Sequence, residues 1–119
     1  MAEEMLPGAA ERASALFADL TEQRWAEARA GFNQQMSERL SARALDGVWA
    51  QVIGTAGGYQ GMSEPVAHQA GDYTVVDVPL HFEAADLTGR VSYARDGQAA
   101  GLFFLNPAQG AQGEREWPR

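Results

Sequence analysis

The residues that could carry out acid–base chemistry are few, and their spacing keeps them apart. His81 and Asp77 fall on the same side of a period-2 stretch that spans residues 74–82. Four residues of a strand separate their side chains by roughly 13 Å, at ~3.3 Å per residue. This separation is too long for a direct acid–base dyad. A pairing of His81 with Arg90 on a neighbouring strand is more typical of a surface or an interface than of catalysis.

Other reactive arrangements are missing from the sequence. The chain has two histidines, no cysteine and no spaced carboxylate cluster, which argues against a metal site and excludes disulfides. Gly57 and Gly58 precede an expected strand rather than a helix carrying lysine, so they do not form a phosphate loop. No serine stands in a nucleophile-elbow context, which argues against hydrolysis by this chain alone. We therefore expect no catalytic residue, no metal and no cofactor.

Tyr93 is the one polar side chain on the face of the sheet that we expect to be buried. If the space between the sheet and the helices holds a ligand, such a tyrosine can donate a hydrogen bond to it. Its alternative role is that of a core tyrosine whose hydroxyl reaches the rim or a buried partner. Tyr59 and Trp25 are the other side chains that could line an interior site for a small apolar ligand.

Composition narrows the classes of partner. At 119 residues the chain is long enough for one domain with its own core. Its net charge of -7 argues against nucleic-acid binding, because phosphate binding needs a basic face. The first residues are acidic where a signal peptide is basic, and no apolar run approaches the ~20 residues of a membrane span. We expect a cytoplasmic protein that binds neither nucleic acid nor membranes.

Helical periodicity dominates the first half of the chain. Apolar residues recur at spacings of three and four from Ala9 to Leu20, and Thr21 is positioned to cap a short second helix that contains Trp25. One or two helical turns follow around residues 36–40. The strongest signal runs from Ser41, a good N-cap, to Ile53, with Gly54 expected to end the helix. The apolar stripe of this helix comprises Leu45, Val48, Trp49, Val52 and Ile53.

After Gly58 the period-2 pattern of strands replaces the helical periodicity. A strand from Tyr59 to Gln69 is interrupted by Glu64-Pro65 and is therefore placed at an edge. Asp96-Gly97 predicts a two-residue type I′ hairpin, and a second two-residue turn at Ala85-Asp86 pairs Leu80 with Val91. Both turns then agree on one buried face, which comprises Val78, Leu80, Phe82, Val91, Tyr93, Leu102 and Phe104.

The opposite face of this predicted sheet mixes apolar and charged side chains. It comprises Asp77, Pro79, His81, Arg90, Ser92, Phe103 and Leu105, with His81, Arg90 and Phe103 in one cross-strand row. Exposed apolar clusters usually mark contact surfaces. We therefore expect a homodimer through this face, with Phe103, Leu105, His81, Pro79, Arg90 and Asp77 at the interface.

The order of elements predicts an α+β fold, in which N-terminal helices pack on a curved four-stranded antiparallel meander. Residues 1–8 form a polar lead-in, 9–107 the single domain, and 108–119 a disordered tail or linker.

A family resemblance accompanies this layout and spans roughly residues 10–106. The matching positions are Phe17, Leu20, Trp25 to Ala28, Phe32, Leu40, Leu45, Trp49, Gly57-Gly58-Tyr59 and Gly101-Leu102-Phe103. In these positions the chain resembles a family of uncharacterised bacterial domains in the nuclear transport factor 2-like superfamily, often found ahead of α/β-hydrolase domains. The resemblance implies a cone-shaped fold but supplies no acid–base residues and no activity.

Three functions stay open from the sequence. The first is a non-catalytic binding or interaction module that dimerises through its sheet. The second is a small-molecule isomerase or cyclase-like enzyme that uses the cone interior, with Tyr93 and Tyr59 as its polar groups. The third is an accessory domain to a separately encoded hydrolase. A roomy interior with convergent polar groups would favour the enzyme, and a filled interior would favour the module.

Overall fold

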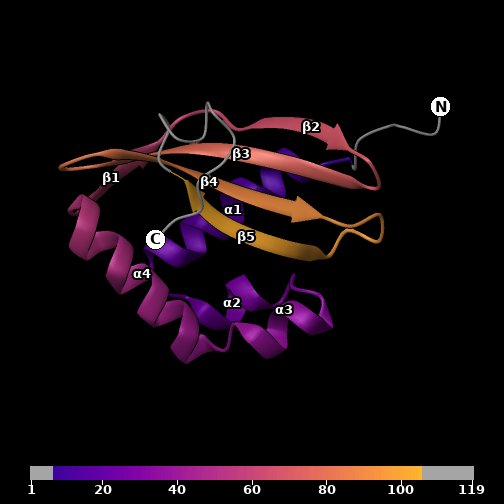
Figure 1. Cartoon of the computed structure of the whole chain (residues 1–119), viewed down its shortest axis with the longest axis horizontal. Coiled ribbons are helices and arrows are strands. Elements are labelled where there is room, and N and C mark those ends of the chain that lie inside the picture. The colour runs from indigo at the N-terminus through magenta and orange to yellow at the C-terminus, as the bar shows by residue number, and fades with distance from the viewer. Residues whose placement is uncertain (1–6, 106–119) are drawn as a thin grey trace.

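A computed structural model describes residues 7–105 and has the predicted α+β architecture, with helices first and an antiparallel sheet after them (Figure 1). The predicted tail at 108–119 lies outside the described residues, as does most of the lead-in. The helices are α1 (Ala9–Thr21), α2 (Trp25–Arg29), α3 (Gln34–Arg39) and α4 (Ala42–Ala56). The strands are β1 (Tyr59–Met62), β2 (Val66–Ala70), β3 (Tyr73–Phe82), β4 (Asp86–Tyr93) and β5 (Ala99–Leu105).

The sheet is organised around β3, the longest strand. Its order is β1-β3-β4-β5, and β2 also pairs with β3, so β1 and β2 lie end to end along one edge of β3. The predicted edge strand is confirmed, but residues 63–65 divide it in two and raise the number of strands from four to five. Pro65 accounts for the division, because proline cannot donate to a ladder.

Polar side chains begin two of the helices. Asn33 and Ser41 accept hydrogen bonds from the amides of Met36 and Ala44, which confirms the predicted cap at Ser41. The predicted cap at Thr21 is wrong, because this residue ends α1 and its hydroxyl donates to the carbonyl of Ala18 at 2.8 Å.

The end of α4 also differs from the prediction. The helix continues through Gly54 to Ala56 and stops at Gly57, whose φ of 93° is left-handed. Gly54 and Gly57 are both suited to the position after a helix, so glycine alone does not decide where the helix ends. The next loop does: the amide of Ala84 donates to the carbonyl of Ala56 at 2.7 Å and holds the helix end against the β3–β4 turn.

The β3–β4 register is shifted from the prediction. Leu80 pairs with Leu87 and Val76 with Val91, whereas the two-residue turn would have paired Leu80 with Val91. The chain instead turns through a wider loop, in which the amide of Phe82 donates to the carbonyl of Ala85 at 3.0 Å. The slip is four residues, an even number, so every side chain keeps its predicted face.

The β4–β5 hairpin is close to the prediction but carries one extra residue. Val91 pairs with Leu102 as predicted, whereas Tyr93 pairs with Ala99 instead of Ala100 because the register shifts between Ser92 and Tyr93. The amide of Gly97 donates to the carbonyl of Ala94, and the φ of Gly97 is 87°. This geometry is a three-residue loop with glycine in the left-handed position, not a type I′ turn.

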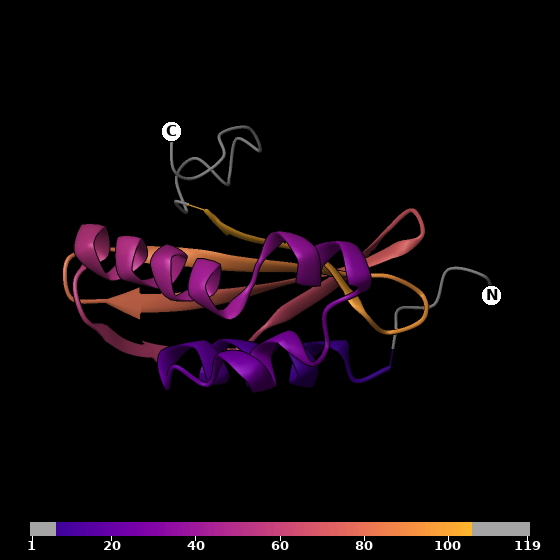
Figure 2. The same cartoon turned by 90° about the horizontal axis from the view of Figure 1, so that it is seen from below.

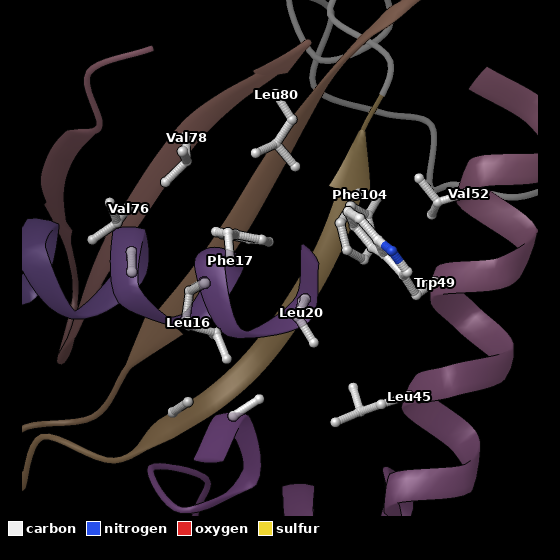
Figure 3. Close-up of a cluster of buried hydrophobic side chains, with 14 of the residues drawn as sticks. Leu16, Phe17, Leu20, Leu45, Trp49, Val52, Val76, Val78, Leu80 and Phe104 are labelled. Carbon is white, nitrogen blue, oxygen red and sulfur yellow. The ribbon is translucent and has the colours of Figure 1, made fainter. Parts of the chain in front are cut away.

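The core lies between the sheet and the helices. In Figure 2 the indigo α1 lies below the strands and the magenta α4 runs in front of them. In Figure 3, Phe17 of α1 and Trp49 of α4 approach Phe104 of β5, with ring centroids 5.9 and 6.1 Å from that of Phe104. Trp49 also lies 5.8 Å from Phe82, so the predicted packing of the α4 stripe on the sheet is confirmed. This part of the interior is filled by side chains.

The free side of β5 is partly covered by the segment between α2 and α3. The amide of Ala99 donates to the carbonyl of Gly31 at 2.7 Å, and the amide of Asn33 donates to the carbonyl of Ala99 at 2.9 Å. Phe32, which lies between these two residues, is buried in the core.

Candidate functional site: an open sheet face and a cleft

The face of the sheet that points away from the helices, here called the open face, carries the exposed apolar side chains. Within residues 7–105 the exposed large hydrophobic residues are Val66 (61% exposed), Tyr73 (45%) and Phe103 (43%). Strand pairing places Val66 and Phe103 on this face, because Val66 is opposite Asp77, Asp77 is opposite Arg90, and Arg90 is opposite Phe103. Tyr73 lies four residues before Asp77 on β3, an even number, so its side chain points to the same face.

The centre of the open face is an ion pair. Arg90 Nε lies 2.7 Å from Asp77 Oδ1 and Arg90 Nη2 lies 3.1 Å from Asp77 Oδ2, a bidentate arrangement. The hydrogen bonds that Arg90 donates to the Asp77 carboxylate raise the pKa of Arg90 above its usual value. The predicted row of His81, Arg90 and Phe103 is therefore wrong, because the four-residue slip brings Asp77 opposite Arg90 and moves His81 away.

The remaining predicted interface residues differ in exposure. Pro79 is half-buried opposite Thr88, and Leu105, also opposite Thr88, is only 8% exposed. Leu105 therefore offers little further surface, and Phe103 is the large apolar side chain that β5 presents on this face.

His81 lies at the end of the open face between two polar neighbours that sequence reasoning did not associate with it. Its Nε2 atom lies 2.7 Å from Ser63 Oγ, and its Nδ1 atom lies 3.2 Å from Asp86 Oδ1. The predicted β3–β4 register hid the second contact, because it placed Asp86 in a turn instead of opposite His81. The first contact depends on the path of the divided edge strand.

A cleft of about 370 Å³ opens at the other end of the molecule, between α1, α2 and the β4–β5 hairpin, and is here called the Tyr93 cleft. Tyr93 and Phe32 are buried members of its wall, and Arg12, Asp19 and Glu27 are its charged members. Arg12 Nη1 donates to the carbonyl of Gly97 at 2.7 Å and closes one side of the cleft.

Burial sets the chemistry of Tyr93. Loss of solvation raises the pKa of its hydroxyl to about 12, although the positive charge of Arg12 acts in the opposite direction. The hydroxyl makes no hydrogen bond to another residue of the described part of the chain. It is therefore a protonated donor that faces the cleft.

The other two predicted ligand residues lie elsewhere. Tyr59 packs on Trp49 and Phe82 at centroid distances of 6.2 and 5.7 Å and borders a separate open hollow. Trp25 is half-buried against the core on α2. The described residues contain no group of histidines and carboxylates that could hold a metal ion. Tyr93 is thus the one predicted ligand residue that lines the cleft.

These features define an α+β domain with one helix-covered sheet face and one open face. The chain belongs to the DUF3887 family, described as proteins of unknown function, whose model matches residues 13–102. No curated protein and no solved structure matches the chain. Within the described residues no helix is long and apolar enough to cross a membrane.

Proposed function

We propose that this protein is an interaction module that pairs with a second copy of itself through its open sheet face, an association that needs no catalytic group. The observation that supports the proposal is one cross-strand row, which reads Val66, Asp77, Arg90, Phe103 from β2 to β5. Its two ends are exposed apolar side chains and its centre is a pair of opposite charges.

This row is complementary to itself. When a second copy is turned by half a revolution about an axis parallel to the strands, the row reads Phe103, Arg90, Asp77, Val66. Each Asp77 then faces an Arg90 of the other copy, and each Val66 faces a Phe103. A half-turn about an axis along the row instead places Asp77 on Asp77, which costs free energy by like-charge repulsion. The charges therefore select one of the two closed pairings of the face.

The size of the face predicts a modest affinity. Four strands at ~4.8 Å and the seven residues of β5 at ~3.4 Å give a projected area of roughly 450 Å² for each copy. Both copies together bury roughly 900 Å², just below the ~1,200 Å² of stable standard interfaces. We therefore expect a dimer that forms at micromolar concentrations and not one that persists at nanomolar dilution.

A charge-exchange experiment tests this pairing directly. Asp77→Arg gives a row with two central cations and Arg90→Asp gives one with two central anions, so each variant alone repels its own copy. An equimolar mixture of the two restores opposite charges across the interface. Sedimentation velocity should find each variant monomeric and the mixture dimeric at tens of micromolar.

The matched control is the double exchange Asp77→Arg with Arg90→Asp. It rebuilds the ion pair within each chain and between the two copies, so it should be a folded dimer by itself. Wild-type protein that sediments as a monomer at tens of micromolar contradicts the proposal and means that something other than a second copy covers the face. A mixture that stays monomeric also contradicts it.

The Tyr93 cleft favours a second candidate, the binding of a small apolar ligand with an oxygen acceptor. The protonated Tyr93 hydroxyl would donate to that oxygen, and Arg12 would favour a negative charge on it. Asp19 opposes an anion less than its charge suggests, because Arg24 Nη2 lies 2.8 Å from it. A series of small apolar carboxylic acids is the natural probe set, and Tyr93→Phe should weaken binding of its best member.

The cone-shaped superfamily resemblance belongs with this second candidate, because such a fold offers a ligand site between its helices and its sheet. The filled region around Trp49, Phe82 and Phe104 weighs against an isomerase or cyclase that uses the centre of the interior. A role beside a separately encoded hydrolase is compatible with either candidate, since an accessory domain needs a binding surface and no chemistry of its own.

A further inference from the structure

Three neighbouring strands bring a serine, a histidine and an aspartate together at the end of the open face. His81 stands on β3, Ser63 follows the end of β1 on one side, and Asp86 begins β4 on the other. The amide of Ser63 donates to the carbonyl of Pro79 at 2.9 Å, which fixes the serine beside the histidine. Asp86 is the direct cross-strand partner of His81.

The atoms that meet are those that a serine nucleophile requires. Ser63 Oγ lies 2.7 Å from His81 Nε2, and Asp86 Oδ1 lies 3.2 Å from His81 Nδ1. With a proton on Nδ1 donated to Asp86, Nε2 is free to accept the hydroxyl proton of Ser63. Serine hydrolases of several unrelated folds have the same contacts of serine with histidine and of histidine with aspartate. In these enzymes the three residues occur in different orders along the chain, so the arrangement is recognised by its geometry and not by sequence position.

The backbone amide that follows the serine in the chain is the candidate donor to a developing oxyanion. The backbone amide of Glu64 makes no hydrogen bond to any other residue in the described part of the chain. Pro65 disfavours helical backbone at Glu64, so the chain stays extended directly after Ser63. The amide of the residue after the nucleophile is one of the two oxyanion donors in α/β-hydrolases.

We propose that Ser63 is a nucleophile activated by His81 and positioned by Asp86, and that it transfers small acyl groups from exposed esters to water. Ser63 Oγ attacks the ester carbonyl while His81 Nε2 takes the hydroxyl proton. The carbon–oxygen bond to the alcohol then breaks, the alcohol leaves with that proton, and an acyl-serine remains. Water attacks the acyl-serine, His81 takes a proton from the water and returns it to Ser63, and the acid departs.

Exposure limits the substrate and the rate. The side chains of His81 and Asp86 are 39% and 61% exposed, so water weakens the electrostatic support that a buried triad has. Ser63 lines neither the Tyr93 cleft nor the hollow beside Tyr59, so neither of them can receive the acyl chain of an ester bound at this serine. Acetyl-sized groups on good leaving groups are the expected substrates.

A fluorophosphonate probe and p-nitrophenyl acetate test the proposal on the full chain. Peptide mass mapping should place the phosphonate on Ser63. Ser63→Ala should abolish labelling, and His81→Ala should slow it by about 10²-fold, the low end of the contribution of a general base. Asp86→Asn should slow it by about tenfold, well below the ~10⁴ of a buried triad, and Asp86→Glu should recover most of the rate.

The chain supplies its own controls. His68→Ala removes the only other histidine, and Ser92→Ala removes another serine of the open face, so both should label and hydrolyse like wild type. An adduct on a different residue, or no adduct on folded wild-type protein, overturns the proposal. Labelling that is equally fast in His81→Ala overturns it as well, because the contacts of His81 would then be purely structural.

Discussion

Phe17 packs its ring directly against the backbone of Gly89. A Cβ atom built on Gly89 would lie 2.4 Å from the nearest ring carbon of Phe17, so no side chain fits at this position without a shift of the Phe17 ring, α1 or β4. Gly89 faces the core between Val78 and Phe104 in the cross-strand row. The pairing of an aromatic ring with a strand glycine thus determines how closely α1 approaches the sheet.

Gly89→Ala should therefore destabilise the fold despite adding a better strand residue. The overpacking range of ~1–3 kcal/mol is expected for the loss in free energy of unfolding. Urea denaturation measures it. In the double variant with Phe17→Leu, the smaller side chain relieves the clash, so the two changes should be less than additive. Simple additivity would mean that the ring and the glycine do not interact.

Trp49→Ala should reduce the free energy of unfolding by ~3–5 kcal/mol, because the indole fills the space between Phe82, Phe104 and Tyr59. Urea midpoints at constant slope provide the measurement. Val48→Ala, a truncation on the same helix at a half-buried position, serves as the control and should cost much less. A Trp49→Ala midpoint equal to that of wild type would refute the packing.

The two glycines near the end of α4 should respond in opposite directions to alanine. Gly54 lies inside the helix with open space around it, so Gly54→Ala should stabilise by about 0.5–1 kcal/mol. Gly57 has a φ of +93°, and a Cβ there would lie 2.8 Å from Glu83 Cβ, so Gly57→Ala should destabilise. Thermal unfolding of the two variants compares them. The reverse order would place the helix end at Gly54.

The raised pKa of Tyr93 predicts that the folded chain loses stability in alkaline solution. Its pKa is about 12 in the folded chain and 10.0 in the reference state, so between these values the unfolded chain loses a proton that the folded chain retains. Stability should be unaffected below pH 10 and fall as pH rises towards 12, by about 1.4 kcal/mol at pH 11 for this group. Urea unfolding of wild type and Tyr93→Phe at pH 9 and 11 should show the smaller loss in the variant. Equal losses would mean that the hydroxyl is solvated.

Phe103→Arg should convert the expected dimer to a folded monomer. The substitution places a charge on the open face and leaves the core unchanged, because Phe103 is 43% exposed in the single chain. Sedimentation equilibrium measures the association, and the thermal midpoint of a dilute sample confirms folding. If the variant associates as strongly as wild type, the interface between the copies does not lie on the open face.

Periodicity was sufficient to predict which side chains face the core. Alternation in β3 and the three–four spacing in α1 and α4 depend on residue type alone, and the buried faces follow them. The edge position of residues 59–69 followed from Pro65, whose missing amide excludes it from a central strand. These predictions depend on local properties of the chain.

The pairing register of β3 with β4 could not be predicted from residue types in the same way. Matching apolar residues across β3 and β4 is satisfied by pairing Leu80 with either Val91 or Leu87, because a slip of four residues preserves both faces. The wider turn is selected by contacts with the end of α4, which lie outside the hairpin. The ion pair of Asp77 with Arg90 and the contacts of His81 depend on this register, so neither could be predicted from the sequence pattern.

The segment that covers β5 at Ala99 also bears on how copies of the chain can meet. An unpaired strand edge is a template on which another chain can add a strand, the first step of uncontrolled aggregation. Residues 31–33 occupy the hydrogen-bonding groups at the start of that edge, and on the far side Pro65 interrupts the edge that β1 and β2 share. Lateral addition of a strand is therefore obstructed at part of each margin. The proposed stacking of open faces would use neither margin and would end after two copies.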